Sequence, residues 1–237
     1  MTRIVAIGEC MVEMAPVATE GQFRLGYAGD TLNTAWYLRR LLGTGDQIDY
    51  FTAIGIDAIS DNMLRFLQEA GIGTKRILRR DDKSVGLYMI QLLDGERSFS
   101  YWRGDSAART LAADPVPLQA ALDGAGLAYF SGVTLAILPP ADRTRFLTVL
   151  RRFRDNGGLV VFDPNLRPKL WASPQEGPET VTQAAPGGGI ALPSYDDEAQ
   201  WFGDENPAAT LERYLRAQVG CCVVKNGADR LLFAEGV

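Results

Sequence analysis

The chain contains no histidine, and this absence excludes several kinds of catalysis at once. Ser-His-Asp and Cys-His catalysis, histidine general bases and most zinc chemistry all depend on an imidazole. Acid–base steps must therefore fall to Asp, Glu, Lys, Tyr or Cys side chains. The cysteines, Cys10, Cys221 and Cys222, are too few and too unfavourably spaced for a disulfide framework or a zinc site, which favours a reducing compartment.

The sequence also lacks a targeting signal, a membrane-spanning run and an excess of positive charge. No stretch approaches the ~20 apolar residues of a membrane span. The short apolar run Ile4–Ile7 meets Gly8 and Glu9, which is unlike a signal peptide. The net charge of -5 gives no indication of the basic surface that nucleic-acid binding requires. We therefore expect a soluble, cytoplasmic protein whose partners are neither membranes nor nucleic acids.

Two nucleotide-binding motifs are missing as well. The pattern G-x-x-x-x-G-K-[ST] does not occur, which excludes a P-loop protein, and no G-x-G-x-x-G follows the first predicted strand. The run Gly187–Gly189 leads into a predicted strand rather than a helix, which is the wrong context for a phosphate cradle. An NAD-linked oxidoreductase is accordingly a distant alternative.

What remains is an ordinary globular composition, with 237 residues that are 46% hydrophobic and 22% charged. Short apolar runs alternate with segments of helical periodicity, and the apolar runs show little internal alternation, as in a sheet covered on both faces. The sequence therefore predicts one doubly wound α/β domain. The predicted strands are Arg3–Ile7, Tyr50–Ile54, Leu127–Ser131, Leu159–Asp163, Ile190–Pro193 and Cys221–Lys225, and the predicted helices are Thr31–Leu42, Ile59–Ala70, a segment from Pro140 to Gly157, and one with Asn206 as N-cap and Pro207 first.

Two segments interrupt this alternation. The β-rich runs Val85–Leu93 and Arg97–Arg103, joined by Asp94-Gly95-Glu96, predict a hairpin that leaves the main sheet as a lid or as a subunit contact. The segment Gly177–Gly189 is rich in glycine and proline and is predicted to be a loop.

The second strand of the hairpin carries candidate binding residues. The two-residue period places Tyr101 and Arg103 on one face and Trp102 on the other, where Trp102 is interpreted as a packing residue. Tyr88 on the first strand joins the former pair if the register allows it. Such a face suits a polyhydroxy acid, because aromatic rings cover the carbon chain and a guanidinium grips a carboxylate. The alternative is a solvated strand face.

A polar loop enters the first predicted helix at Gly29-Asp30-Thr31-Leu32-Asn33. Gly29 permits close backbone approach, and Asp30 and Asn33 stand in the first turn, where free N–H groups also point outward. The loop is either an ordinary N-cap or a site in which Asp30 holds substrate hydroxyls.

Polar residues also follow the predicted strand Leu159–Asp163. Proline disfavours helical geometry in the residue before it, so Asp163 and Arg167 are expected to be extended and to project with Asn165 to one side. Ligands bind at the carboxyl ends of strands in open α/β sheets. A binding role is therefore a better interpretation than solvation alone.

Two further segments allow two interpretations each. Lys225-Asn226-Gly227-Ala228-Asp229 follows a core strand, and it either lines a nucleotide pocket or forms a plain turn into Arg230–Ala234. Glu198, in Asp196-Asp197-Glu198, either orients a hydrated Mg²⁺ ion or belongs to an ordinary acidic helix start.

Together these segments resemble the ribokinase-like carbohydrate kinases over essentially the whole chain. Within that family the closest resemblance is to the 2-keto-3-deoxygluconate kinases, although fructokinase-like members share a run similar to Asp163–Trp171. The resemblance rests on Ile7–Glu13, Gly29–Ala35, Gly86-Leu87-Tyr88, Tyr101-Trp102-Arg103, Ser131–Leu138, Asp163–Trp171 and Val224–Asp229, which occur in the family's order.

The resemblance implies an α/β/α sandwich with a small β lid, at about residues 11–28 and 84–104, and transfer of the γ-phosphoryl group of ATP, with Mg²⁺, to 2-keto-3-deoxygluconate. The implied substrate-binding residues are Gly29, Asp30, Asn33, Tyr88, Tyr101, Arg103 and Arg167. The implied nucleotide-binding residues are Asn165, Lys225, Gly227, Ala228, Asp229 and Arg230, with Glu198 as the candidate for the metal through water. An exposed aromatic lid also suggests a homo-oligomer.

The chain departs from the family in one respect that concerns catalysis. The family's Gly-Ala-Gly-Asp segment, whose aspartate takes the proton of the substrate hydroxyl, does not occur here, and its expected place lies beyond Val237. The expectation is therefore a domain incomplete at its C-terminus and without its catalytic Asp. The alternatives are a fructokinase-like or ribokinase-like kinase of a neutral sugar, and a non-catalytic sugar-binding protein of the same fold.

Overall fold

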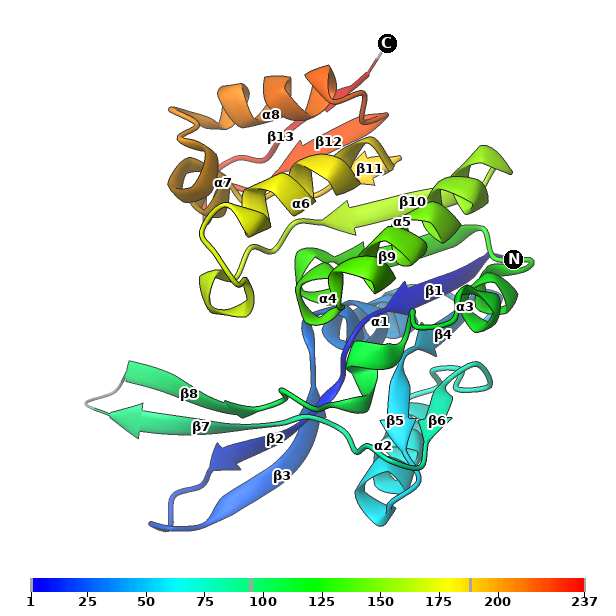
Figure 1. Ribbon diagram of the computed structural model, residues 1–237. Helices are drawn as coiled ribbons and strands as arrows, with labels where there is room; N and C mark the ends of the chain where they lie inside the picture. Colours follow the sequence, from blue (N-terminus) through cyan, green and yellow to red (C-terminus); the bar gives the residue numbers. More distant parts are fainter. Residues whose placement is uncertain (1, 94–95, 188, 237) are drawn as a thin grey trace.

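The fold is built on a seven-stranded sheet, and the computed structural model describes residues 2–93, 96–187 and 189–236 (Figure 1). The strand order is β13-β12-β11-β10-β9-β1-β4, and neighbouring strands are parallel except for β12 and β13. The bounds are β1 Arg3–Ile7, β4 Gln47–Phe51, β9 Leu127–Ser131, β10 Leu159–Asp163, β11 Ile190–Ala191, β12 Cys221–Val224 and β13 Leu232–Glu235. The predictions for β1, β9 and β10 are confirmed with the same bounds.

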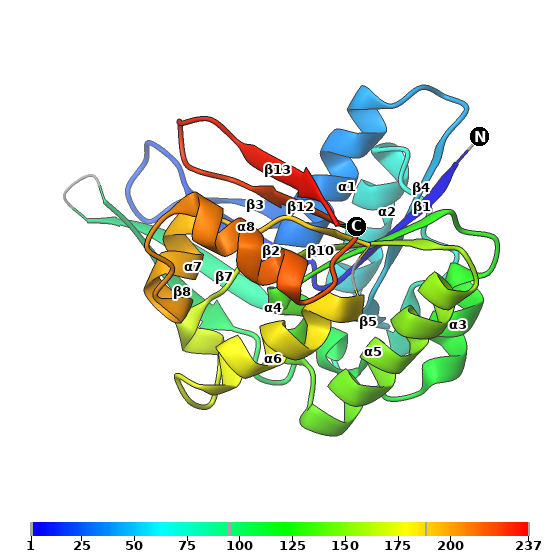
Figure 2. The same cartoon turned by 90° about the horizontal axis from the view of Figure 1, so that it is seen from above.

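Helices cover both faces of this sheet, as a doubly wound fold requires (Figure 2). Val5 and Ile7 of β1 belong to a core built with α3, α5 and α6, whereas Ile4 and Ala6 belong to the core under α1 and α2. This alternation follows from the two-residue period of a strand. The bounds are α1 Asp30–Leu41, α2 Ala58–Glu69, α3 Pro115–Leu122, α4 Gly132–Ile137, α5 Pro140–Asp155, α6 Glu176–Ala184, α7 Tyr195–Phe202 and α8 Pro207–Arg216, with short 3₁₀ segments at Ala107–Thr110, Pro168–Leu170 and Ala185–Gly187.

The loop predicted over Gly177–Gly189 is wrong for most of that segment, because α6 and a 3₁₀ segment occupy it; its residue 188 lies outside the described chain. Pro178 stands in the first turn of α6, where a missing N–H breaks no helical hydrogen bond. Gly177 packs closely against Trp171, whose ring would lie 3.1 Å from an added β-carbon. Burial of Val181 then stabilises a helix that the local composition disfavours.

The single strand predicted over Tyr50–Ile54 is also wrong, because the segment divides between two sheets. β4 ends at Phe51 in the main sheet, whereas β5 (Ala53–Gly55) pairs with β6 (Leu78–Arg80) in a separate two-stranded sheet. A continuous apolar run does not reveal such a change of partner, since both halves are buried.

A second sheet of four strands projects away from the main sheet and is called the lid below (Figure 1). Its order is β3-β2-β7-β8, with bounds β2 Met11–Pro16, β3 Phe23–Ala28, β7 Leu87–Leu93 and β8 Glu96–Trp102. The predicted hairpin is confirmed as the antiparallel pair β7–β8, although residues 94–95 of its turn lie outside the described chain. The register pairs Tyr88 with Tyr101, so these two side chains share a face.

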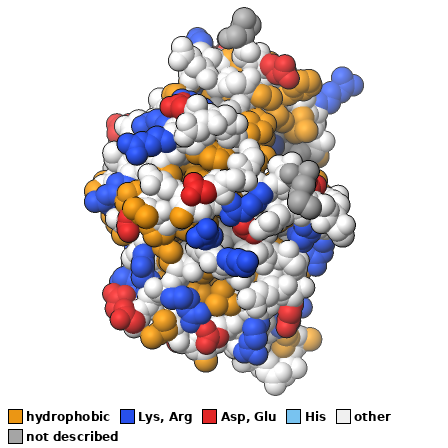
Figure 3. Space-filling view, turned by 90° about the vertical axis from the view of Figure 1, so that its right-hand side faces the viewer, with side chains coloured by type: hydrophobic (Ala, Val, Ile, Leu, Met, Phe, Trp, Pro, Cys, Tyr) orange, Lys and Arg blue, Asp and Glu red, His pale blue; other side chains and the backbone are white. Residues whose placement is uncertain are grey.

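The helices of the described chain and the face shown in Figure 3 bear on the predictions about membranes and charge. None of the helices in residues 2–93, 96–187 and 189–236 combines the length and apolar character needed to cross a bilayer. Basic and acidic side chains are interspersed with apolar ones over the face shown in Figure 3.

Two glycines allow backbone segments to meet where β1, β9 and β10 end. A β-carbon on Gly29, which precedes α1, would overlap the carbonyl oxygen of Glu9, just after β1. A β-carbon on Gly132, which begins α4 after β9, would overlap the carbonyl oxygen of Pro164, just after β10. Because only glycine leaves room for these contacts, the carboxyl ends of the central strands come together at one place.

Replacing Gly132 by alanine should destabilise the protein, because the new methyl group forces the segment after β10 away. We expect the free energy of unfolding to fall by about 1–3 kcal/mol, the usual cost of overpacking. Urea denaturation followed by circular dichroism measures the change. Gly45→Ala is the matched control, since a β-carbon there meets nothing within 4 Å. A loss no larger than that of the control would contradict the interpretation.

Candidate active site

A cavity of about 690 Å³ lies between the lid and the carboxyl ends of the central strands. The walls come from the segment after β1, the start of α1, the lid hairpin and the segment after β10. All seven residues predicted to bind the substrate line it, together with one predicted to border a nucleotide: Gly29, Asp30, Asn33, Tyr88, Tyr101, Arg103, Arg167 and Asn165.

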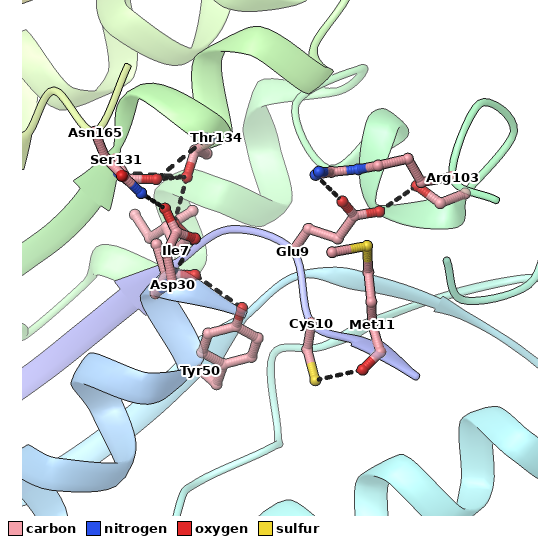
Figure 4. A network of polar contacts seen from close by, with 12 residues as sticks. Ile7, Glu9, Cys10, Met11, Asp30, Tyr50, Arg103, Ser131, Thr134 and Asn165 are labelled. Atoms are coloured by element: carbon pink, nitrogen blue, oxygen red, sulfur yellow. Dashed lines mark hydrogen bonds and ion pairs between the residues drawn. The ribbon is translucent and has the colours of Figure 1, made fainter. Parts of the chain in front are cut away.

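The carboxylate of Asp30 is fixed from two sides at the start of α1. One oxygen accepts a hydrogen bond from the backbone N–H of Thr31 at 2.8 Å, and the other accepts from the side-chain amide of Asn165 at 2.8 Å (Figure 4). Asn165 adopts a left-handed backbone conformation with φ 35°, which asparagine tolerates better than most residues. The structure thus brings Asn165, predicted at the nucleotide, into contact with Asp30, predicted at the substrate.

The lid contributes an aromatic wall to the cavity. The ring centroids of Tyr88 and Tyr101 lie 5.8 Å apart, and those of Phe99 and Tyr101 lie 6.2 Å apart. The Tyr88 hydroxyl donates a hydrogen bond to Glu13 on the neighbouring strand β2. Burial and this carboxylate raise the pKa of Tyr88 above its ordinary value, so the phenol stays neutral.

Arg103 lies at the end of β8 and is largely buried, with 11% of its side chain exposed. Its Nη2 donates to Oε2 of Glu9, and the hydroxyl of Ser106 donates to the other oxygen of Glu9 (Figure 4). Burial raises the pKa of the Glu9 carboxyl, whereas Arg103 and Ser106 act in the opposite direction.

The sequence analysis quoted Glu9 in a motif but assigned it no role. The signal for such a role is a carboxylate within the largely apolar stretch Ile4–Val12, because a carboxylate that is buried there needs a partner. The partner itself is 94 residues away and cannot be read from the sequence.

Arg167 approaches the same cavity from the segment after β10. Its side chain is 53% exposed, and Nη1 donates to the carbonyl oxygen of Leu166 at 2.7 Å. The carboxylate of Asp197, on α7, lies 3.5 Å from the same nitrogen. Two guanidinium groups from separate parts of the fold, those of Arg103 and Arg167, therefore line one cavity.

The predicted nucleotide turn lies outside this cavity and connects the antiparallel strands β12 and β13. Its first residue, Lys225, donates to Oδ2 of Asp163 at 2.7 Å across the ends of β12 and β10. The other oxygen of Asp163 is buried without a hydrogen-bond partner among the described residues, and burial raises the pKa of this carboxyl. The remaining predicted residues of this turn, Gly227, Ala228, Asp229 and Arg230, are exposed.

The geometry does not support the predicted metal role of Glu198. Its side chain is fully buried, one oxygen accepts from Arg213 at 2.5 Å, and the other accepts from the hydroxyl of Tyr214 at 3.1 Å. Burial raises the pKa of Glu198 to about 7, against the effect of Arg213. Among the residues that the structure describes, no group of three or more His, Cys, Asp or Glu side chains could hold a metal ion.

Comparison with curated proteins places the chain among sugar kinases. It is 39% identical over 241 residues to the 2-dehydro-3-deoxygluconokinase of Haemophilus influenzae, with 99% of this chain and 76% of that protein covered. It is 41% identical over 236 residues to the 2-dehydro-3-deoxygluconokinase of Dickeya dadantii, with 97% and 74% covered.

Solved structures confirm the predicted ribokinase-like α/β fold. A PfkB protein from Polaromonas sp. JS666 superposes with a TM-score of 0.87 at 25% identity, covering 99% of this chain and 79% of that one. A fructokinase with bound ATP from Xylella fastidiosa gives a TM-score of 0.84 at 20% identity, covering 99% and 75%. The model of the pfkB family carbohydrate kinases matches residues 1–237. The chain therefore belongs to the pfkB family of carbohydrate kinases.

Proposed function

We propose that this kinase transfers the γ-phosphoryl group of ATP to the terminal hydroxyl of 2-keto-3-deoxygluconate, also called 2-dehydro-3-deoxygluconate, to form 2-keto-3-deoxy-6-phosphogluconate. The observation that carries the proposal is the convergence of Arg103 and Arg167 on one cavity. A neutral hexose has no group that requires two guanidinium ions. The relatives that share 39–41% identity bear the name of this activity.

Each wall of the cavity has a part in binding this substrate. Arg103 and Arg167 donate hydrogen bonds to the carboxylate, and charge-assisted bonds of this kind are among the strongest in proteins. The rings of Tyr88 and Tyr101 cover the carbon chain, since aromatic faces pack well against apolar CH groups. Asp30, held by Asn165, accepts hydrogen bonds from sugar hydroxyls.

Lys225 fits a role at the phosphates of ATP, because its ammonium group stands at the carboxyl end of β12 and is 42% exposed. A cation there offsets the charge that develops during phosphoryl transfer, and ATP supplies the group transferred. Magnesium is proposed to arrive bound to the phosphates, since the buried Glu198 is already paired. The resemblance assigns proton acceptance to the aspartate of a Gly-Ala-Gly-Asp segment, which residues 1–237 do not contain.

The lid is also proposed to form a contact between two copies of the chain. Trp102 and Leu25 are 59% and 51% exposed. The registers of β2, β3, β7 and β8 place both on the lid face opposite Tyr101. Exposed apolar side chains on one face of a small sheet are typical of a protein interface. The proposed location is the cytoplasm, in keeping with three free thiols.

Replacing Arg167 by alanine should weaken binding of 2-keto-3-deoxygluconate by about 10-fold or more, the usual value of a hydrogen bond to a charged group. Binding of 3-deoxy-D-fructose, in which a hydroxymethyl group replaces the carboxylate, should change little. Isothermal titration calorimetry measures both affinities. Arg145→Ala on α5, where 44% of the side chain is exposed, is the matched control. Equal losses for both sugars would contradict the carboxylate role.

Replacing Lys225 by alanine should weaken ATP binding by about 10-fold or more, because a cation near the phosphates is lost. Affinity for the sugar acid should stay within about threefold, since Lys225 does not line the cavity. Calorimetry with a non-hydrolysable ATP analogue measures the change. Lys75→Ala, at an exposed lysine after α2, is the control. Unchanged ATP affinity would remove Lys225 from the nucleotide site.

The double variant Leu25→Ser and Trp102→Ser should lower the average molecular mass seen in sedimentation velocity. Both side chains are exposed, so we expect the fold to persist, which far-ultraviolet circular dichroism checks. Val116→Ser, at an apolar residue of α3 that is 62% exposed, is the control. If the wild-type chain sediments as a monomer, the lid contact does not exist.

A further inference from the structure

Glu9 lies in the segment that connects the main sheet to the lid. It follows β1 of the main sheet and precedes β2 of the lid, and only 1% of its side chain is exposed. Both carboxylate oxygens are engaged, one by Arg103 at the end of the lid hairpin and one by Ser106 (Figure 4). Ser106 directly precedes the 3₁₀ segment that belongs to the main core. Through these two hydrogen bonds, Glu9 connects Arg103 to the main domain.

The surroundings leave this pair little freedom. A β-carbon on Gly86 would lie 3.0 Å from Oε1 of Glu9, 3.1 Å from Met11 and 3.2 Å from Cβ of Arg103. Nε of Arg103 is buried without a hydrogen-bond partner, and the Tyr101 ring centroid lies 5.9 Å from its Cζ. Glu9 holds Nη2, whereas Nη1 makes no hydrogen bond within the described part of the chain. The Nη1 group of Arg103 is thus available to a ligand in the cavity that this residue lines.

Two effects of Glu9 on an incoming carboxylate oppose each other. Its negative charge offsets part of the charge of Arg103, which weakens attraction to any anion. Its hydrogen bond also fixes a long side chain before the ligand arrives, and this preorganisation reduces the entropy lost on binding. A neutral sugar experiences neither effect, so the ratio of the affinities for the acid and its neutral analogue reports on the contacts to the carboxylate.

We propose that Glu9 is a positioning residue that gives the cavity its selectivity for sugar acids, because it holds the guanidinium of Arg103 in the orientation that receives the carboxylate. The inference rests on the proposed function and names how the same cavity distinguishes an acid from a neutral sugar. The proposal requires that the length of the Glu9 side chain, rather than its charge, determines the orientation of Arg103. Glutamine has the same length without the charge, whereas aspartate has the charge but is one methylene shorter.

The experiment compares Glu9→Gln with Glu9→Asp. Calorimetry gives the affinities of each protein for 2-keto-3-deoxygluconate and for 3-deoxy-D-fructose. Glu9→Asp should lower the acid-to-neutral affinity ratio by about 10-fold or more, since the shorter side chain cannot hold Nη2. Glu9→Gln should keep the ratio within about threefold, because its amide oxygen still accepts from Arg103 and its NH₂ group can donate to Ser106. The reverse order, with aspartate tolerated and glutamine not, would overturn the proposal in favour of a purely electrostatic role.

A double-mutant cycle tests whether Glu9 acts through Arg103. In the Arg103→Ala background, Glu9→Asp should change the ratio no further, and full additivity would overturn the proposal. Asp49→Ala, which breaks the partly buried pair with Arg3 at the other end of β1, is the control for general destabilisation and should leave the ratio unchanged. A wild-type chain that binds both sugars equally would refute the sugar-acid function itself. Discrimination that survives Glu9→Asp would refute only the role of Glu9.

Discussion

The cavity exists because polypeptide backbones approach closely at the carboxyl ends of β1, β9 and β10. Gly29 rests on the carbonyl oxygen of Glu9, and Gly132 rests on that of Pro164, so no side chain separates these segments. The contacts bring the start of α1 and the segment after β10 close enough for Asn165 to bond Asp30. A larger residue at either glycine would move whole walls of the site. Backbone packing thus positions the segments that carry Asp30 and Asn165.

The cations of the site differ in how firmly the protein holds them. Arg103 is paired with a carboxylate that is 1% exposed, Lys225 with one that is 16% exposed, and Arg167 with one that is 27% exposed at the longest distance, 3.5 Å. A buried pair is costly to break, whereas an exposed pair contributes little. Arg103 is accordingly a fixed element of the cavity. Arg167 can leave its partner for a ligand at small cost, which suits its proposed role at the substrate carboxylate.

The sequence predicted the parts of the fold that depend on local pattern and missed those that depend on distant partners. The strands β1, β9 and β10 were predictable because each is a short apolar run bounded by polar residues or glycine. Helix α6 was not, because Gly177 and Pro178 oppose it locally and the core contacts of Val181 and Ala184 stabilise it. Glu9 was missed for the same reason, since its role depends on a residue of the lid.

The bond between Asn165 and Asp30 bears on how two substrates share the site. The family resemblance assigns these residues to different ligands, yet their side chains are in contact at 2.8 Å. Asn165 adopts a left-handed backbone conformation directly after Pro164, which packs against Gly132. A ligand that draws the amide of Asn165 away frees an oxygen of Asp30, and a sugar that engages Asp30 competes for the same bond. Under the proposed assignments, the sugar and nucleotide sites meet through this hydrogen bond, so binding of one ligand is expected to affect binding of the other, and phosphoryl transfer between neighbouring ligands requires such proximity.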